Sequence, residues 1–167
     1  MPVSTESIRV LRELTGAGIM DCKRALEDSA GNFEKAEEIL RKKGIALAAK
    51  KSSRVAHEGL IEAYIHNGSR IGAIIELNCE TDFVARTPAF RELAHGLAMQ
   101  VAAMSPLYID QKELPVNYEG NPQEQCLLLQ PFIKDPARSV QDLVNDAIAR
   151  VGENIRVKRF VRFALGE

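Results

Sequence analysis

The chain has 167 residues, of which 46% are hydrophobic and 27% are charged, and its formal net charge is −1 at pH 7. These values lie close to the average of globular proteins and argue against a disordered chain. The near-neutral charge and an aromatic content of only 5% also argue against a nucleic-acid-binding protein, which needs clustered basic residues and stacking rings.

The three cysteines, Cys22, Cys79 and Cys126, are far apart and form no C-x-x-C pair. They predict neither a disulfide framework nor a zinc site, and they are typical of a protein in a reducing compartment. The first residues contain no charged leader, and no run of about 18 apolar residues occurs anywhere. We therefore expect a cytoplasmic protein without a membrane span.

Three short helical patterns occupy residues 4–16, about 19–29, and 32–44. Ser4 and Asn32 are typical N-caps, and glycines end the first and third patterns. Because the connections are short, the three helices are predicted to form one compact unit. The apolar residues with helical spacing are Ile8, Leu11 and Leu14, then Ile19, Cys22, Ala25 and Leu26, then Phe33, Ala36, Ile39 and Leu40.

Residues 45–55 mix alanine, lysine and serine and are predicted to be a partly helical, basic connector. The hydrophobic period changes after this segment. We therefore predict two domains, residues 1–55 and residues 56–167.

Two strand-like runs, residues 59–66 and 70–77, follow the connector. Asn67, Gly68 and Ser69 between them predict a β-hairpin, because Asn and Gly tolerate a positive φ angle. Thr87 and Pro88 then predict the start of a helix that lies across the sheet. Its apolar stripe is Phe90, Leu93, Ala94, Leu97, Ala98, Val101 and Ala102.

Residues 105–136 contain several prolines and glycines and are predicted to be a loop region. Ser139 followed by Asp142 indicates a capping box at the start of a last helix, which Gly152 ends. A final strand over residues 155–164 is expected to point four apolar residues to one side, Ile155, Val157, Val161 and Phe163. The fold class is therefore α+β, with a three-helix module followed by an antiparallel sheet packed with helices.

Four stretches of the chain resemble the elongation factor Ts family. They are residues 15–26, 78–86, 130–135 and 152–160, and the second, Asn-Cys-Glu-Thr-Asp-Phe-Val-Ala-Arg, is similar to the family's signature. The resemblance implies a ubiquitin-associated-like helical module and a core that together bind elongation factor Tu carrying GDP. It also implies that the chain promotes GDP release by disturbing the magnesium and phosphate site, without enzymatic chemistry and without a cofactor of its own.

The resemblance implies that the signature residues Thr81, Asp82, Phe83 and Val84 contact elongation factor Tu. A phenylalanine beside Val84 and Ala85 is, on its own, most often a core residue. Its place between a polar run and Arg86, at a corner from strand to helix, favours an exposed side chain instead. We expect Phe83 to project outward.

In the helical module, the resemblance implies that Met20, Asp21 and Lys23 are contacts for elongation factor Tu. A purely structural interpretation stands beside it, in which Asp21 favours the helix N-terminus and Lys23 is a solvated charge. The chain has room for a single core and shows no internal repeat, so the resemblance to short family members implies a homodimer.

Two other classes of function remain open at this point. The three helices could be a general binding module for ubiquitin-like or nascent-chain partners. Alternatively, Cys79 or Asp82 could serve a small hydrolase. Against the second, His57, His66 and His95 are scattered, and no Gly-rich phosphate loop occurs.

Overall fold

The computed structural model describes residues 3–167 and begins with three helices, α1 (Thr5–Thr15), α2 (Ile19–Asp28) and α3 (Phe33–Lys51). The side chains of Ser4 and Asn32 accept hydrogen bonds from backbone amides at the starts of α1 and α3, as predicted. Gly16 ends α1 with a φ angle of 68°. The three helices pack around Leu11, Leu26 and their neighbours and form what we call the helical module.

Helix α3 does not end at Gly44, so that prediction is wrong. The helix continues to Lys51, and Gly44 is buried within it. The physical reason is a close approach to α7 (Val140–Val151), because a Cβ atom on Gly44 would lie 3.4 Å from the Cβ of Ala149. Packing here outweighs the roughly 1 kcal/mol that glycine costs inside a helix. The division into domains 1–55 and 56–167 stays a prediction, and α3 runs through most of the boundary region.

The core contains a three-stranded antiparallel sheet in the order β1-β2-β5, with β1 (Glu58–Ile65), β2 (Ile71–Cys79) and β5 (Arg156–Ala164). The predicted hairpin is confirmed, with Ile65 opposite Gly72 at its turn. Helix α5 (Pro88–Met104), which Thr87 caps as predicted, packs against the sheet. The main buried side chains between them are Ile75, Leu77, Phe90, Leu97 and Val101.

The prediction that the apolar residues of the last strand share one side is wrong. Leu77 is opposite Val157 and Glu76 is opposite Arg159, so Lys158 is an extra residue in β5. Such a β-bulge reverses the alternation of side chains beyond it. Val157 is consequently buried, whereas Val161 and Phe163 are exposed on the other face of the sheet.

The region predicted to be a loop contains several short elements. They are η1 (Gln111–Glu113), α6 (Pro122–Gln125), η2 (Leu127–Leu129), β3 (Pro131–Phe132) and β4 (Asp135–Ser139). Buried Gln100 of α5 anchors this region, because its amide donates to Gln130 Oε1 (3.0 Å) and to the Pro131 carbonyl (3.1 Å). Gln100 Oε1 also accepts from the amide of Ile133 at 2.9 Å. The family-like stretch 130–135 therefore attaches this region to α5.

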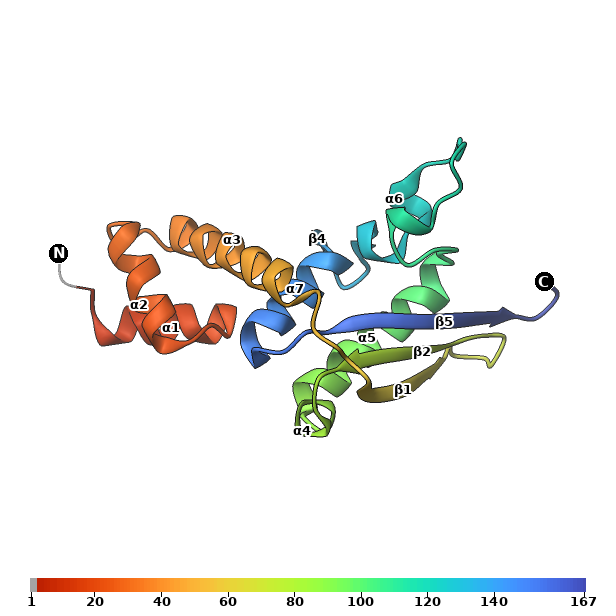
Figure 1. Ribbon diagram of the computed structural model, residues 1–167, viewed down its shortest axis with the longest axis horizontal. Coiled ribbons are helices and arrows are strands. Elements are labelled where there is room, and N and C mark those ends of the chain that lie inside the picture. The colour runs from red at the N-terminus through yellow and green to blue at the C-terminus, as the bar shows by residue number, and fades with distance from the viewer. Residues whose placement is uncertain (1–2) are drawn as a thin grey trace.

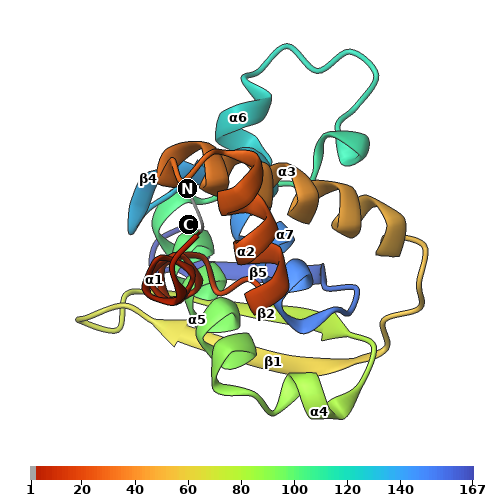
Figure 2. The same cartoon turned by 90° about the vertical axis from the view of Figure 1, so that its left-hand side faces the viewer.

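The capping box predicted for α7 is confirmed, with Ser139 and Asp142 satisfying each other's backbone amides. The helical module lies at one end of the long axis of the molecule, and the C-terminus lies at the other (Figure 1). In both views, the short helix α4 (Asp82–Ala85) and α6 lie on opposite sides of the molecule (Figure 2). Within residues 3–167, no helix is both long and apolar enough to cross a membrane.

We expect Gln100→Leu to destabilise the fold by about 3 kcal/mol, because it leaves the buried Gln130 and two part-buried backbone groups without their hydrogen bonds, and an unpaired buried group costs about 1–3 kcal/mol. Urea unfolding measures this change. Gln123→Leu is the matched control, since Gln123 is exposed on α6 and should change stability little. Equal stability of the two variants would contradict the anchoring role.

Candidate functional site

The signature stretch forms a corner between strand β2 and helix α5, and we call residues 79–86 the tip. β2 ends at Cys79, and Thr81 precedes the single-turn helix α4. Val84 and Ala85 point into the core, whereas Phe83 is 78% exposed. The exposure expected for Phe83 is confirmed. Val84 therefore fixes the turn from inside, and Phe83 is the apolar side chain that the tip presents.

Two charged groups flank Phe83 on the same turn. The guanidinium of Arg86 lies 2.7 Å from the Asp82 carboxylate in an ion pair that spans one helical turn. Both side chains are solvent-exposed to a large extent, so the pair contributes little stability. The tip thus offers an aromatic ring together with a carboxylate and a guanidinium that a partner can reach.

Another family-like stretch, residues 152–160, contributes the residues that bind the start of the tip. Glu153 Oε2 accepts hydrogen bonds from the amides of Glu80 (3.1 Å) and Thr81 (3.0 Å), and Glu153 Oε1 accepts from Thr81 Oγ1 at 2.6 Å. In return, Glu80 Oε1 accepts from the amide of Asn154 at 2.6 Å. Sequence reasoning missed Glu153 as a site residue, although its place in a family-like stretch was the available signal.

The same segment is attached to the end of α3. The Asn154 side chain donates to the carbonyl of Arg54 at 2.8 Å, and Lys51 Nζ donates to the carbonyl of Gly152. The guanidinium of Arg54 also lies 3.6 Å from Glu80. Residues 152–154 therefore connect the tip to the C-terminal end of α3, the last helix of the helical module.

Met20, Asp21 and Lys23, the residues of the helical module predicted to contact a partner protein, lie on α2, away from the tip. Met20 is 57% exposed and next to exposed Ile19, so Ile19 is not part of the buried helix face that its spacing predicted. Asp21 forms an ion pair with Lys43 of α3, and Lys23 lies 3.8 Å from Glu27. Asp21 thus has a structural partner as well as an exposed edge.

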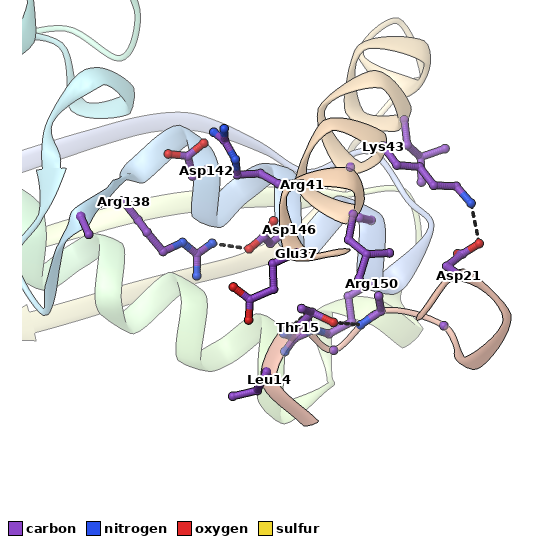
Figure 3. A pocket seen from close by; sticks show the side chains of 18 residues that line it. Leu14, Thr15, Asp21, Glu37, Arg41, Lys43, Arg138, Asp142, Asp146 and Arg150 are labelled. Carbon is purple, nitrogen blue, oxygen red and sulfur yellow. Dashed lines mark hydrogen bonds and ion pairs between the residues drawn. The ribbon is translucent and has the colours of Figure 1, made fainter. Parts of the chain in front are cut away.

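A cleft of about 500 Å³ lies beside the contact of α3 with α7 and is lined by residues of the helical module, β4 and α7 (Figure 3). Arg150 of α7 crosses it and donates to the carbonyl of Thr15 at 3.3 Å, and its guanidinium occupies the space that a Cβ atom on Gly16 would need. On the β4 side of the cleft, Arg138 pairs with Asp146 of α7. Burial raises the pKa of Asp146 despite this neighbouring charge.

The residues considered for hydrolytic chemistry do not form a reactive site. Cys79 is buried, and burial together with the charge of Glu153 raises the pKa of its thiol to about 11. A thiol with that pKa is almost fully protonated at neutral pH and is a poor nucleophile. His95 contacts Glu62 and His66 contacts Tyr64, both away from Cys79 in the fold. Over residues 3–167, no cluster of three metal-ligating side chains is present.

The exposure of Phe83 predicts an unusual stability result. We expect Phe83→Ala to leave the free energy of unfolding nearly unchanged, because the ring buries little surface. Phe90→Ala is the matched control, since Phe90 is 2% exposed and its truncation should cost about 3–5 kcal/mol. Urea unfolding of both variants checks the contrast, and a large loss for Phe83→Ala would mean that the ring belongs to the core.

The chain is similar in sequence to known proteins of one family. A family model described as "Elongation factor TS" matches residues 23–119. Curated proteins named "Elongation factor Ts" from Moorella thermoacetica and Carboxydothermus hydrogenoformans are 50% and 48% identical over 99% of this chain, covering 96% and 90% of those relatives. The protein of that name from Thermotoga petrophila is 47% identical over 100% of this chain and 98% of its own length.

These alignments run over 195 residues, although this chain has 167. The relatives therefore contain residues that have no counterpart here. The family match itself ends at residue 119, inside the irregular segment that precedes α6. The identity over nearly the whole length leaves no ambiguity about descent: the chain belongs to the elongation factor Ts family.

Proposed function

We propose that this chain promotes GDP release from elongation factor Tu by inserting the tip, with Phe83 at its end, beside the magnesium and phosphate site of that partner. Membership of the elongation factor Ts family makes it a non-enzymatic guanine-nucleotide exchange factor. The observation that carries the proposed mechanism is the exposed Phe83 on a corner that the core holds rigidly. An exposed aromatic ring on a fixed support is a typical anchor of a protein interface.

The exchange is a linkage between two ligands of elongation factor Tu. If the factor weakens GDP binding, GDP must weaken binding of the factor to the same extent. A thousandfold effect corresponds to about 4 kcal/mol, whereas truncation of one aromatic anchor costs about 2 kcal/mol or somewhat more. Phe83 alone would not account for an effect of that size, which would need a second contact.

We propose that the helical module supplies this second contact through Met20, Asp21 and Lys23. Support comes from the neighbouring apolar residues Ile19 and Met20 on α2, each of which is more than half exposed. In this scheme the module supplies affinity for elongation factor Tu, and Thr81, Asp82, Phe83 and Val84 form and support the tip that disturbs the nucleotide. The site of action is the cytoplasm, and no nucleic acid or cofactor takes part.

The outer face of the sheet supports a homodimer. Five large apolar side chains are exposed on this face, in three adjacent strands, and a groove of about 250 Å³ lies among some of them. Antiparallel sheets with one solvated face normally carry polar residues there, and monomers rarely expose an apolar patch of this kind. We propose that two chains pack these faces together about a twofold axis. The five residues are Ile61, Ile65, Ile74, Val161 and Phe163.

Stopped-flow release of a fluorescent GDP analogue from elongation factor Tu tests the exchange mechanism. The wild-type chain should accelerate release, and Phe83→Ala should reduce the maximal rate about tenfold or more. Met20→Ala should instead raise the concentration needed for half-maximal acceleration, because it removes affinity only. Binding of the wild-type chain without any acceleration would overturn the proposal.

Analytical ultracentrifugation tests the dimer. We expect the wild-type chain to sediment as a dimer and Ile74→Lys to sediment as a monomer, since the new charge would be buried at the centre of the paired faces. Val116→Lys is the matched control, because Val116 is a fully exposed apolar residue outside the sheet. A monomeric wild type, or equal dissociation by both variants, would contradict the interface.

A further inference from the structure

We propose that Glu153 is a positioning residue for nucleotide exchange that acts through Phe83. The inference rests on the proposed function of the tip and extends it to a residue 70 positions beyond Phe83 in the chain. Glu153 does not belong to the tip, and it is partly buried behind it. Its carboxylate makes three hydrogen bonds, and all three go to the two residues that lead into α4.

The first step of the argument concerns the backbone amides at the corner. The amides at the start of a helix have no partner within the helix, and β2 has already ended at Cys79. Thr81 caps α4 without any hydrogen bond from its own side chain to the following amides. The carboxylate of Glu153 instead accepts from the amides of Glu80 and Thr81, and bonds to an ionised acceptor are stronger than neutral ones.

The second step concerns the length of α4. A helix of four residues is too short to be stable by itself, so its direction depends on what holds its two ends. At its C-terminal end, Thr87 Oγ1 donates to the carbonyl of Val84 at 2.7 Å, and Val84 and Ala85 are buried. At its N-terminal end, Glu153 accepts from the amides of Glu80 and Thr81, and Cys79 Sγ donates to the Thr81 carbonyl at 3.1 Å. Loss of Glu153 leaves both amides without their acceptor and loosens that end, so the ring of Phe83 is then no longer presented in one direction.

The third step concerns the neighbours of Glu153 in the chain. Asn154 binds both Glu80 and the carbonyl of Arg54, and the carbonyl of Gly152 accepts from Lys51 of α3. The segment that supports the tip is thus fixed to the helix that carries the helical module. A partner held by the module therefore meets a tip whose support is attached to the same helix.

The experiment is the same stopped-flow release, with the maximal rate and the half-saturating concentration measured separately for each variant. Glu153→Ala should lower the maximal rate about 10- to 100-fold, as expected for a displaced active group, and should leave the half-saturating concentration unchanged. Glu153→Gln should retain most of the rate, because its amide oxygen can accept both backbone bonds while its NH₂ group donates to Thr81 Oγ1. Glu119→Ala, an exposed carboxylate in the irregular segment, is the matched control and should behave as wild type.

A double-mutant cycle separates positioning from general loss of structure. Because Glu153 acts through the Phe83 ring, Glu153→Ala should cause no further loss in a Phe83→Ala background. An equal fold-loss in both backgrounds would overturn the proposal, and so would a Glu153→Ala variant with the wild-type maximal rate. If Glu153→Ala does not fold, Thr81→Val replaces it, since it removes only the 2.6 Å hydroxyl bond. It should give a smaller loss that also disappears without Phe83, and an unchanged rate for it would overturn the proposal.

The outcome for the wild-type chain keeps the two proposals apart. A wild type that binds elongation factor Tu without accelerating GDP release would overturn the proposed function and this inference with it. A wild type that accelerates release, together with an active Glu153→Ala variant, would overturn this inference alone.

Discussion

The interlock between residues 79–81 and residues 152–154 is the constraint on which the rest of the structure depends. It joins the end of a strand to the end of a helix through reciprocal hydrogen bonds, in which the carboxylates of Glu153 and Glu80 each accept from a backbone amide of the other segment. Neither segment has enough local hydrogen bonding to fix its own shape, because each lies where a regular element has just ended. Two segments that lack local partners bind each other here, directly before the turn that carries the exposed ring of Phe83.

In this arrangement, one set of elements exposes apolar side chains and another set holds those elements in position. On the surface, α2 and α4 present apolar side chains that contribute nothing to the core. Beneath them, α3, α7 and the sheet supply the packing that keeps these side chains in place. A binding protein without a reactive group can act on its partner only through such rigid presentation, since the free energy of distortion must come from the contacts themselves.

Local signals predicted most of the fold. Caps at Ser4, Asn32 and Ser139 and the turn at Asn67-Gly68 were sufficient because their physical causes lie within a few residues. The bulge at Lys158 could not be predicted, since it exists only in the pairing of β5 with β2. In the same way, Glu153 meets its partners across 72 and 73 positions of sequence. The exposed residues of the site could be predicted from the sequence. The residues that support them could be identified only in the folded chain.

Because α3 continues through Gly44, the fold should tolerate inserted or deleted residues in some segments and not in α3. Helix α3 is one continuous rod that joins the helical module to the segment behind the tip. One inserted residue in such a rod would turn the module by about 100° and shift it by about 1.5 Å relative to everything beyond it. The irregular segment near residue 119 transmits no such rotation, because it both leaves and rejoins the core there. This chain should therefore tolerate added or lost residues in that segment far better than in α3, where the number of residues sets the orientation of the helical module.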